Sequence, residues 1–332
     1  MRRLRILIWH IHGSYLNALA RIEHDWYLPV KPGKPEGYGG RGPTFDLPEY
    51  MREVPADEVR DLDLDLIIYQ TPKNYYQDGP EILTERQRAL PSIYLEHSTP
   101  KPDAVNTRHP AADSGILLVH VTHYNRLMWD NGQAPTMVIE HSVAIAPDVR
   151  YTGQVERGIT VVNGPQRRAR MVGLDIFLRA AKSVPLDLVG MDTEQFGGLG
   201  DIPYRDLHAR VAEYRFLFSP MRYTSLPFAV IEAMTLGMPV VALATTELPT
   251  VIENGVTGYV SCDVDRLVGD MRHLLAHPDE ARRIGENARA LASERFGLPR
   301  FARDWNAAFE RALDMEAASP HAPLISGKEF RS

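Results

Sequence analysis

The stretch that most constrains the fold of this chain runs from Ser219 to Ala242 and reads SPMRYTSLPFAVIEAMTLGMPVVA. Its pattern predicts a strand end, a tight loop, a helix, a Gly-Met-Pro turn and a second apolar strand. A helix that begins straight after such a loop offers unpaired N–H groups and a positive dipole end to an anion. Glu232 lies about one turn into the helix, where its carboxylate can accept hydrogen bonds from vicinal hydroxyls. A ligand with a phosphate near Leu226, Pro227 and Phe228 would have its hydroxyls about one helical turn further along. A nucleotide has this arrangement of groups.

Short apolar strands alternate with helices or loops along the whole chain. Strands are expected at 5–12, 65–70, 92–96, 116–121 and 136–139, and again at 158–163, 186–190, 215–219, 239–244 and 257–261. Helices are expected at 15–22, 81–90, 124–130, 173–181, 205–211, 248–252, 263–275, 279–295 and 301–316. Apolar strands separated in this way favour parallel sheets covered on both faces. The predicted fold class is therefore α/β, with two Rossmann-like β/α domains facing across a cleft.

Length and composition limit the class of protein. The 332 residues suffice for two domains, and the net charge of −6 argues against a broad nucleic-acid surface. The single cysteine, Cys262, excludes an intrachain disulfide and a cysteine-built metal site. The apolar run after the basic N-terminus is too short for a signal peptide, so a cytoplasmic location is expected. Arg2, Arg3 and Arg5 are compatible with contact to the inner face of a membrane, but they are too few to argue it.

Distinctive residues follow the expected strands, where parallel sheets bind their ligands. They are His12-Gly13 and His97-Ser98 in the first half, and Asn163-Gly164, Gly190-Met191-Asp192 and Ser219-Pro220 in the second. The Gly- and Pro-rich segment 31–48 is expected to be a loop that helps to shape an acceptor side. The Asp-x-Asp spacing in 61–65 precedes a strand instead of following one, so it is interpreted as a polar strand entrance and no metal is predicted.

Several motifs in the second half together resemble a known family. They are Glu232-Ala233-Met234, Gly237-Met238-Pro239-Val240-Val241, the segment 253–260, Gly173-Leu174-Asp175 and Leu188-Val189-Gly190. This set resembles the nucleotide-sugar site of the retaining GT-B glycosyltransferases, in particular family 4 (glycosyl transferases group 1). The resemblance covers the C-terminal half almost end to end, and the N-terminal half only in layout.

The resemblance implies a domain plan. It implies an acceptor-side domain over 1–153, a nucleotide-sugar-binding domain over 154–300, a C-terminal helix over 301–318 that crosses back to the first domain, and a tail over 319–332. It also implies a nucleotide-diphosphate sugar as donor substrate, no other cofactor, and a glycan, lipid-linked or small-molecule acceptor, with polysaccharide or glycoconjugate assembly as the setting. The sugar, the base and the oligomeric state stay open.

Site residues follow from the same resemblance. Glu232 would bind the ribose, the backbone near Leu226, Pro227 and Phe228 would bind the diphosphate, and further donor contacts are expected from Gly13, Arg170 and Gly190. His97, Thr224 and Arg167 are the expected catalytic residues. His97 would reach the donor sugar, and an Arg would neutralise the departing diphosphate.

Two positions depart from the family pattern. Thr224 stands where the family has its first Glu, and Val172 stands where it has a Lys. Arg167 or Arg170 is expected to supply the missing positive charge. These departures keep two alternatives open: a catalytically degenerate nucleotide- or partner-binding subunit, and a sugar-nucleotide epimerase or hydrolase on the same fold.

Overall fold

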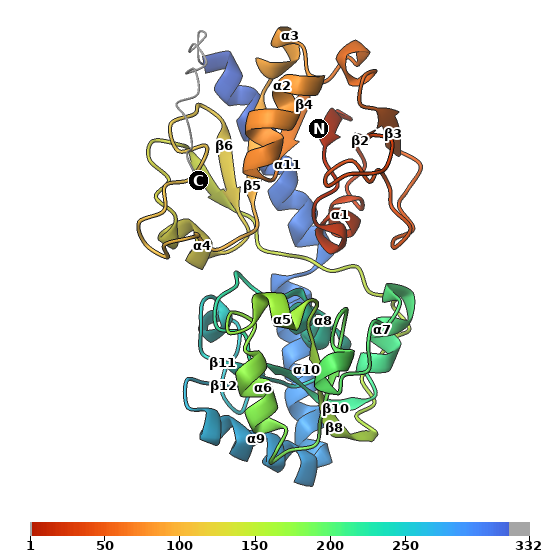
Figure 1. Cartoon of the computed structure of the whole chain (residues 1–332), viewed down its shortest axis with the longest axis vertical. Coiled ribbons are helices and arrows are strands. Elements are labelled where there is room, and N and C mark those ends of the chain that lie inside the picture. Colours follow the sequence, from red (N-terminus) through yellow and green to blue (C-terminus); the bar gives the residue numbers. More distant parts are fainter. Residues whose placement is uncertain (1, 319–332) are drawn as a thin grey trace.

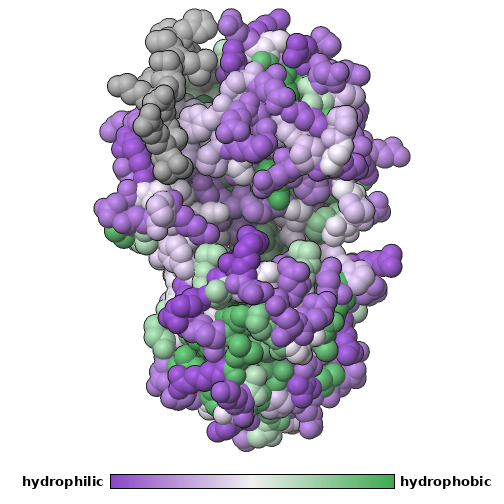
Figure 2. All heavy atoms as spheres, viewed as in Figure 1, coloured by the Kyte–Doolittle hydropathy of each residue, from purple (hydrophilic) through white to green (hydrophobic). Residues whose placement is uncertain are grey.

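The structure is a computed structural model and describes residues 2–318. Two α/β bodies lie end to end, and the chain crosses between them near residues 139–155 and again at the start of the last helix (Figure 1). Figure 2 shows a hollow at the waist between the bodies, with hydrophilic side chains around it. The predicted fold class, two Rossmann-like domains with parallel sheets, is confirmed.

The N-terminal body is a seven-stranded parallel sheet in the order β3-β2-β1-β4-β5-β6-β7. Its strands are β1 (Arg5–Ile8), β2 (Asp25–Val30), β3 (Met51–Pro55), β4 (Leu66–Tyr69), β5 (Ser92–Glu96), β6 (Leu117–His120) and β7 (Thr136–Val138). Its helices are α1 (Gly13–Leu19), α2 (Gly79–Ile82), α3 (Glu85–Arg88) and α4 (His123–Met128), with short turns at Val59–Asp61 and Asn74–Asp78.

The sequence reading of this body missed two strands and one helix break. The sequence predicts five strands there, but β2 and β3 add two at one edge of the sheet. Both contain a proline, which weakens a strand signal because it cannot donate to the ladder. The helix expected over 81–90 is two helices, because Thr84 leaves helical geometry and caps α3 together with Gln87.

The C-terminal body is a five-stranded parallel sheet in the order β12-β11-β10-β8-β9. Its strands are β8 (Val155–Val161), β9 (Leu186–Val189), β10 (Tyr214–Ser219), β11 (Val240–Leu243) and β12 (Gly258–Ser261). Its helices are α5 (Pro165–Arg168), α6 (Leu174–Ala180), α7 (Tyr204–Val211), α8 (Phe228–Leu236), α9 (Val264–Ala276) and α10 (Pro278–Arg295). The segments Glu194–Phe196 and Leu248–Thr250 are single 3₁₀ turns.

The strand order of this sheet marks a ligand crevice. From β8 the chain adds β9 on one side and then returns to place β10 on the other. Loops leave a parallel sheet in opposite directions at such a reversal, and the space between them is where open α/β sheets bind ligands. The crevice lies at the carboxyl ends of β8 and β10, beside the loop that leads into α8.

The last helix, α11 (Leu298–Ala318), completes the core of the other body. Phe301, Trp305 and Phe309 are fully buried among the side chains of the N-terminal sheet. The Trp305 indole N–H donates to the Tyr15 hydroxyl at 3.1 Å. Figure 1 shows this helix running up along the N-terminal body. The C-terminal end of the described chain therefore packs on the first body, although it follows the second body in the sequence. The tail expected over 319–332 lies outside the described residues.

Candidate functional site

The centre of the candidate site is Glu232 on α8. The helix begins at Phe228 directly after Pro227, whose φ of −64° suits a helix start, and it ends at Leu236, followed by Gly237 as a left-handed cap. Because α8 is apolar on nearly every face and packs against the inner strands β10 and β11 and against α10, Glu232 is only 7% exposed. Its Oε1 accepts a hydrogen bond from the Tyr204 hydroxyl at 3.1 Å, and His208 Nε2 lies 3.3 Å from the same oxygen. Burial and the neighbouring carboxylate raise the pKa of Tyr204, so the phenol keeps its proton.

The loop before α8 lies against the N-terminal body. Leu226 is buried in the C-terminal core, and the Phe228 ring lies 4.6 Å from the ring of His141. The Tyr223 hydroxyl donates to the Pro100 carbonyl at 3.1 Å, which ties this loop to the loop after β5. Thr224 is half-buried between these contacts. The segment expected to hold a diphosphate is therefore enclosed by both bodies.

Neutral histidines line the N-terminal side. His97 follows β5, and its Nε2 lies 3.0 Å from the Gln70 side-chain oxygen. Its ring is 4.1 Å from that of His12 and 4.8 Å from that of Tyr15. Burial, with the nearby His12, holds the pKa of His97 well below its usual value. His97 is therefore uncharged at neutral pH and can act on a ligand as a hydrogen-bonding group.

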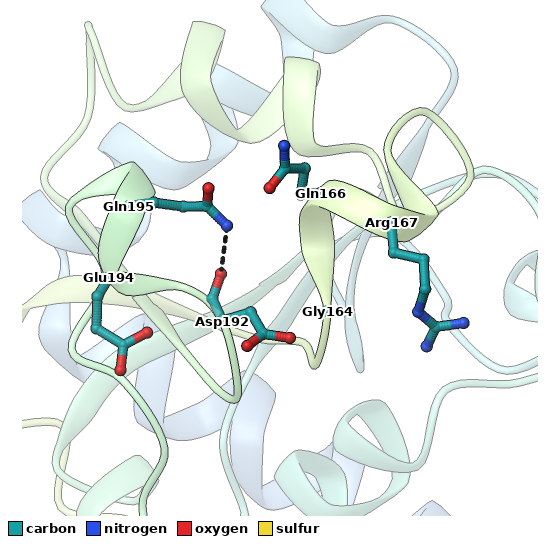
Figure 3. Close-up of a pocket in the computed structure, with 6 residues that line it drawn as sticks. All are labelled: Gly164, Gln166, Arg167, Asp192, Glu194 and Gln195. Atoms are coloured by element: carbon teal, nitrogen blue, oxygen red, sulfur yellow. Dashed lines mark hydrogen bonds between the residues drawn. The ribbon is translucent and has the colours of Figure 1, made fainter.

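Arg167 lies at the mouth of an open pocket. This pocket of about 690 Å³ lies beside the carboxyl ends of β8 and β9, and its lining residues are Gly164, Gln166, Arg167, Asp192, Glu194 and Gln195. Figure 3 shows Arg167 on one side of the Asp192 carboxylate and Gln195 on the other, with the Gln195 amide donating to the Asp192 carbonyl at 3.4 Å. Within residues 2–318 no hydrogen bond or ion pair holds the Arg167 guanidinium, so its charge is available to an anion.

Arg170 is held in a different way. Its guanidinium lies 3.0 Å from Asp175, and the same carboxylate accepts two hydrogen bonds from Arg222, at 2.6 and 2.8 Å. Arg222 also donates to the Arg170 carbonyl at 2.8 Å. One carboxylate thus neutralises part of the charge of two arginines. Val172 is buried in the core, so its position contributes no polar group.

The two glycines of the expected donor site have different surroundings. Gly190 has φ +131°, and a Cβ there would lie 2.2 Å from the Val162 carbonyl oxygen, so glycine is required by the close packing of β9 on β8. Gly13 opens α1, and a Cβ there would lie 2.6 Å from Cε2 of Phe45. The backbone of Gly13 is therefore covered by an aromatic ring.

The acidic segment at 61–65 lies away from the site. Asp65 enters β4 at its amino end and accepts hydrogen bonds from Arg2 and Arg5. Burial alone would raise the pKa of Asp65, but the hydrogen bonds from Arg5 and Arg2 hold it below its usual value. Among the described residues no group of three or more His, Cys, Asp or Glu side chains is arranged to hold a metal ion.

Most of the expected site residues lie near the junction of the two bodies, in two separate groups. Glu232, Phe228, Gly13 and His97 lie around the central contact between the bodies, whereas Arg167 and Gly190 lie toward the edge strand β9. Sequence reasoning missed the residues that contact these positions from elsewhere in the chain: Phe45, Tyr204, His208, Arg222 and Tyr223. Arg222 and Tyr223 carried a signal, because they fall inside the loop that opens the 219–242 stretch, and Phe45 lies in the Gly- and Pro-rich segment 31–48.

Comparison with known proteins finds a family match within the C-terminal body. Residues 193–291, which include α7, α8 and Glu232, match the family model of the glycosyl transferases group 1. This segment of the C-terminal body is similar to that family. The expected resemblance to this family is thereby confirmed.

Curated and solved relatives agree with this assignment. The MMP alpha-(1->4)-mannosyltransferase of Mycolicibacterium hassiacum is 33% identical over 126 residues, which are 36% of this chain and 29% of that protein. Sucrose-phosphate synthase from Thermosynechococcus elongatus has a TM-score of 0.70 at 16% identity, covering 96% of this chain and all of that one. HepE of Anabaena, solved with UDP, has a TM-score of 0.67 at 16% identity over 93% of this chain and all of that one. At such identities the structural matches establish the GT-B fold alone.

No helix within residues 2–318 is long and apolar enough to cross a membrane.

Proposed function

We propose that this GT-B protein moves a sugar from a nucleotide-diphosphate donor to an acceptor hydroxyl, with retention at the anomeric carbon. The observation that carries the proposal is the buried Glu232 carboxylate on α8, inside the family match and behind a loop enclosed by both bodies. Its second oxygen, Oε2, has no hydrogen-bond partner among the described residues and can accept from a ribose hydroxyl. The relatives support a donor of this class, since HepE was solved with UDP and with UDP-glucose.

The residues suggest how the reaction proceeds. The bond from the anomeric carbon to the diphosphate breaks, and the acceptor oxygen bonds to that carbon on the same face. The acceptor proton passes to the leaving phosphate oxygen, so no carboxylate base is needed. Arg167 and the N–H groups at the start of α8 stabilise the departing charge. Thr224 offers the sugar a neutral hydroxyl in place of the family's carboxylate, and His97 offers an imidazole hydrogen bond.

A binding-only role is the second candidate. Thr224 and Val172 lack the charges of the family pattern, and Arg170 is committed to Asp175. This candidate predicts nucleotide binding without turnover. The main proposal also includes a metal-independent reaction and a cytoplasmic location. It places the reaction in polysaccharide or glycoconjugate assembly.

Transfer assays with UDP-, GDP- and dTDP-sugars separate these functions. We expect release of the nucleoside diphosphate, a glycosylated acceptor with retained configuration, and activity that is unchanged by EDTA. Binding without turnover would favour the binding-only role, and epimerised or hydrolysed donor as the main product would favour the epimerase or hydrolase alternative. If no donor binds, the transferase proposal is lost.

The ribose assignment has its own test. Glu232→Gln should weaken donor binding by about 10- to 100-fold, because hydrogen bonds to a charged group are worth about 1.5–3 kcal/mol. Glu286→Gln on the exposed face of α10 is the matched control and should bind donor like the wild type. Equal donor affinity in all three proteins would show that Glu232 does not bind the ribose.

A further inference from the structure

The loop between β2 and β3 reaches into the candidate donor site. Phe45 on this loop lies so close to Gly13 that a Cβ on the glycine would be 2.6 Å from Cε2 and 3.4 Å from Cδ2 of the ring. The ring therefore lies at contact distance from the Gly13 backbone. Gly13 is the position at which a donor is expected to approach the N-terminal body, so ring and donor compete for the same space.

The same ring also reaches across to the other body. The ring centroids of Phe45 and Tyr204 are 4.6 Å apart at 63°, a favourable edge-to-face contact. Tyr204 in turn donates its hydroxyl to Oε1 of Glu232 at 3.1 Å. A hydroxyl from α7 thus occupies one oxygen of the carboxylate whose other oxygen the proposed function assigns to the ribose hydroxyls. One chain of contacts runs from Gly13 through Phe45 and Tyr204 to Glu232.

Hydrogen bonds hold the residues on both sides of the loop tip that carries Phe45. The Arg41 guanidinium donates to the carbonyls of Pro48 and Met51 at 2.7 and 2.9 Å, and also to the Leu47 carbonyl. His10 Nδ1 lies 2.6 Å from the Gly40 carbonyl oxygen. Between these anchors, residues 42–46 form a short tip in which only Phe45 packs against the core. The residues on both sides of the tip are thus held by hydrogen bonds, whereas the tip itself is held by the contacts of one ring.

We infer that the Phe45 side chain is an internal plug of the donor site. In the free protein it occupies the site together with Tyr204, and it moves out of the site when a nucleotide sugar binds. The inference rests on the proposed function, because the competing ligand is the donor. At any moment the plug then closes the donor site in part of the free protein. The apparent dissociation constant is therefore the intrinsic one divided by the fraction of molecules that is open. Opening moves the Phe45 ring away from Gly13 and from Tyr204, and the ribose then binds Glu232 through Oε2, the oxygen that Tyr204 leaves free.

Calorimetric titration with UDP, GDP and dTDP tests the plug. Phe45→Ala should bind the nucleotide that the wild type prefers more tightly, by on the order of tenfold. Asp46→Ala is the matched control, since Asp46 is the exposed next residue on the same tip, and it should bind like the wild type. Unchanged or weaker binding by Phe45→Ala, with the wild type still binding, would overturn the plug and leave the proposed function standing.

Hydrogen exchange of the wild type gives a second readout that needs no variant. A plug predicts faster amide exchange over residues 42–47 when the preferred nucleoside diphosphate is saturating, because the tip is released. Slower exchange there would mean that the tip closes over bound ligand, and the plug would be wrong. If neither the wild type nor Phe45→Ala binds any of the three nucleotides, the plug and the proposed function fail together.

Discussion

Single arginines decide how much charge the site offers to a diphosphate. The position that carries a lysine in the family is Val172, which is buried in the core. Arg170 and Arg222 share the Asp175 carboxylate, so part of their charge is already balanced. Arg167 is exposed and has no partner within residues 2–318. It is the guanidinium most available to a leaving group.

Arg167→Ala should therefore reduce turnover more than it reduces stability. The loss of one charge-assisted contact to the departing diphosphate predicts a kcat lower by about 10- to 100-fold. The midpoint of thermal unfolding should stay unchanged, since no contact in the described chain is lost. Steady-state kinetics and calorimetry measure both. Arg266→Ala, an exposed arginine on α9, is the control, and an equal loss of kcat in both variants would contradict the role of Arg167.

Among the elements, the strands of the N-terminal sheet carry buried histidines at their carboxyl edge. His97 follows β5, His120 ends β6, and His141 lies just beyond β7. Burial lowers the pKa of His120 and of His141 to about 3, and that of His97 well below its usual value. Each histidine is neutral in the folded protein at pH 6, whereas an unfolded chain begins to protonate near pH 6.5. The unfolded state therefore takes up more protons as the pH falls.

The N-terminal body should lose stability on mild acidification. Its unfolding free energy should be greatest above pH 6.5 and should fall by about 1.4 kcal/mol per pH unit for each neutral histidine between pH 6 and 4. Urea titration followed by tryptophan fluorescence measures this, because Trp9, Trp26, Trp129 and Trp305 all lie in this body or in α11.

His120→Gln is the matched variant for this measurement, because glutamine keeps an N–H for the Asn131 side-chain oxygen, which lies 2.7 Å from His120 Nε2. The variant should lose less stability on acidification than the wild type, by the contribution of one histidine. A stability that is flat or rises as the pH falls would contradict the assignment of neutral histidines.

At the scale of the whole molecule, an ionic cluster joins the two bodies behind the site. Arg295 at the end of α10 lies 2.6 Å from Glu140 and 3.5 Å from Glu247. Glu247 is 2% exposed and accepts the Tyr124 backbone N–H at 2.7 Å from across the waist. Together with α11, the cluster fixes how the two bodies face each other.

Arg295→Met should weaken the coupling between the bodies. It leaves the buried Glu247 without its cation, which costs about 3 kcal/mol when one partner of a buried pair is removed. In differential scanning calorimetry, the unfolding transitions of the two bodies should then lie further apart in temperature than in the wild type. The exposed Arg303→Met on α11 is the control and should keep the wild-type profile. A single unchanged transition in Arg295→Met would show that α11 alone couples the bodies.

Local patterns in the sequence were enough to predict the fold class and the position of Glu232. Strand, loop and helix signals act over a few residues, because each is set by backbone hydrogen bonding and by which side chains must be buried. The 219–242 stretch therefore folds as expected, with α8 beginning at Phe228 and ending at Leu236 before the Gly237 cap. The strands β2 and β3 escaped prediction, because their prolines obscure the local signal and only the pairing of β2 with β1 and of β3 with β2 makes them strands.

Contacts between distant segments were decided by the tertiary structure alone. Phe45 lies against Gly13, Tyr204 holds Glu232, and Arg222 shares Asp175 with Arg170, although each pair is far apart in the sequence. Such pairs depend on how two sheets and a crossing helix pack, and no periodicity along the chain encodes that packing. The sequence by itself determined two β/α domains and placed the Glu232 carboxylate on a helix. The tertiary structure decided which side chains occupy the site before a ligand does, because that depends on the packing of one body against the other.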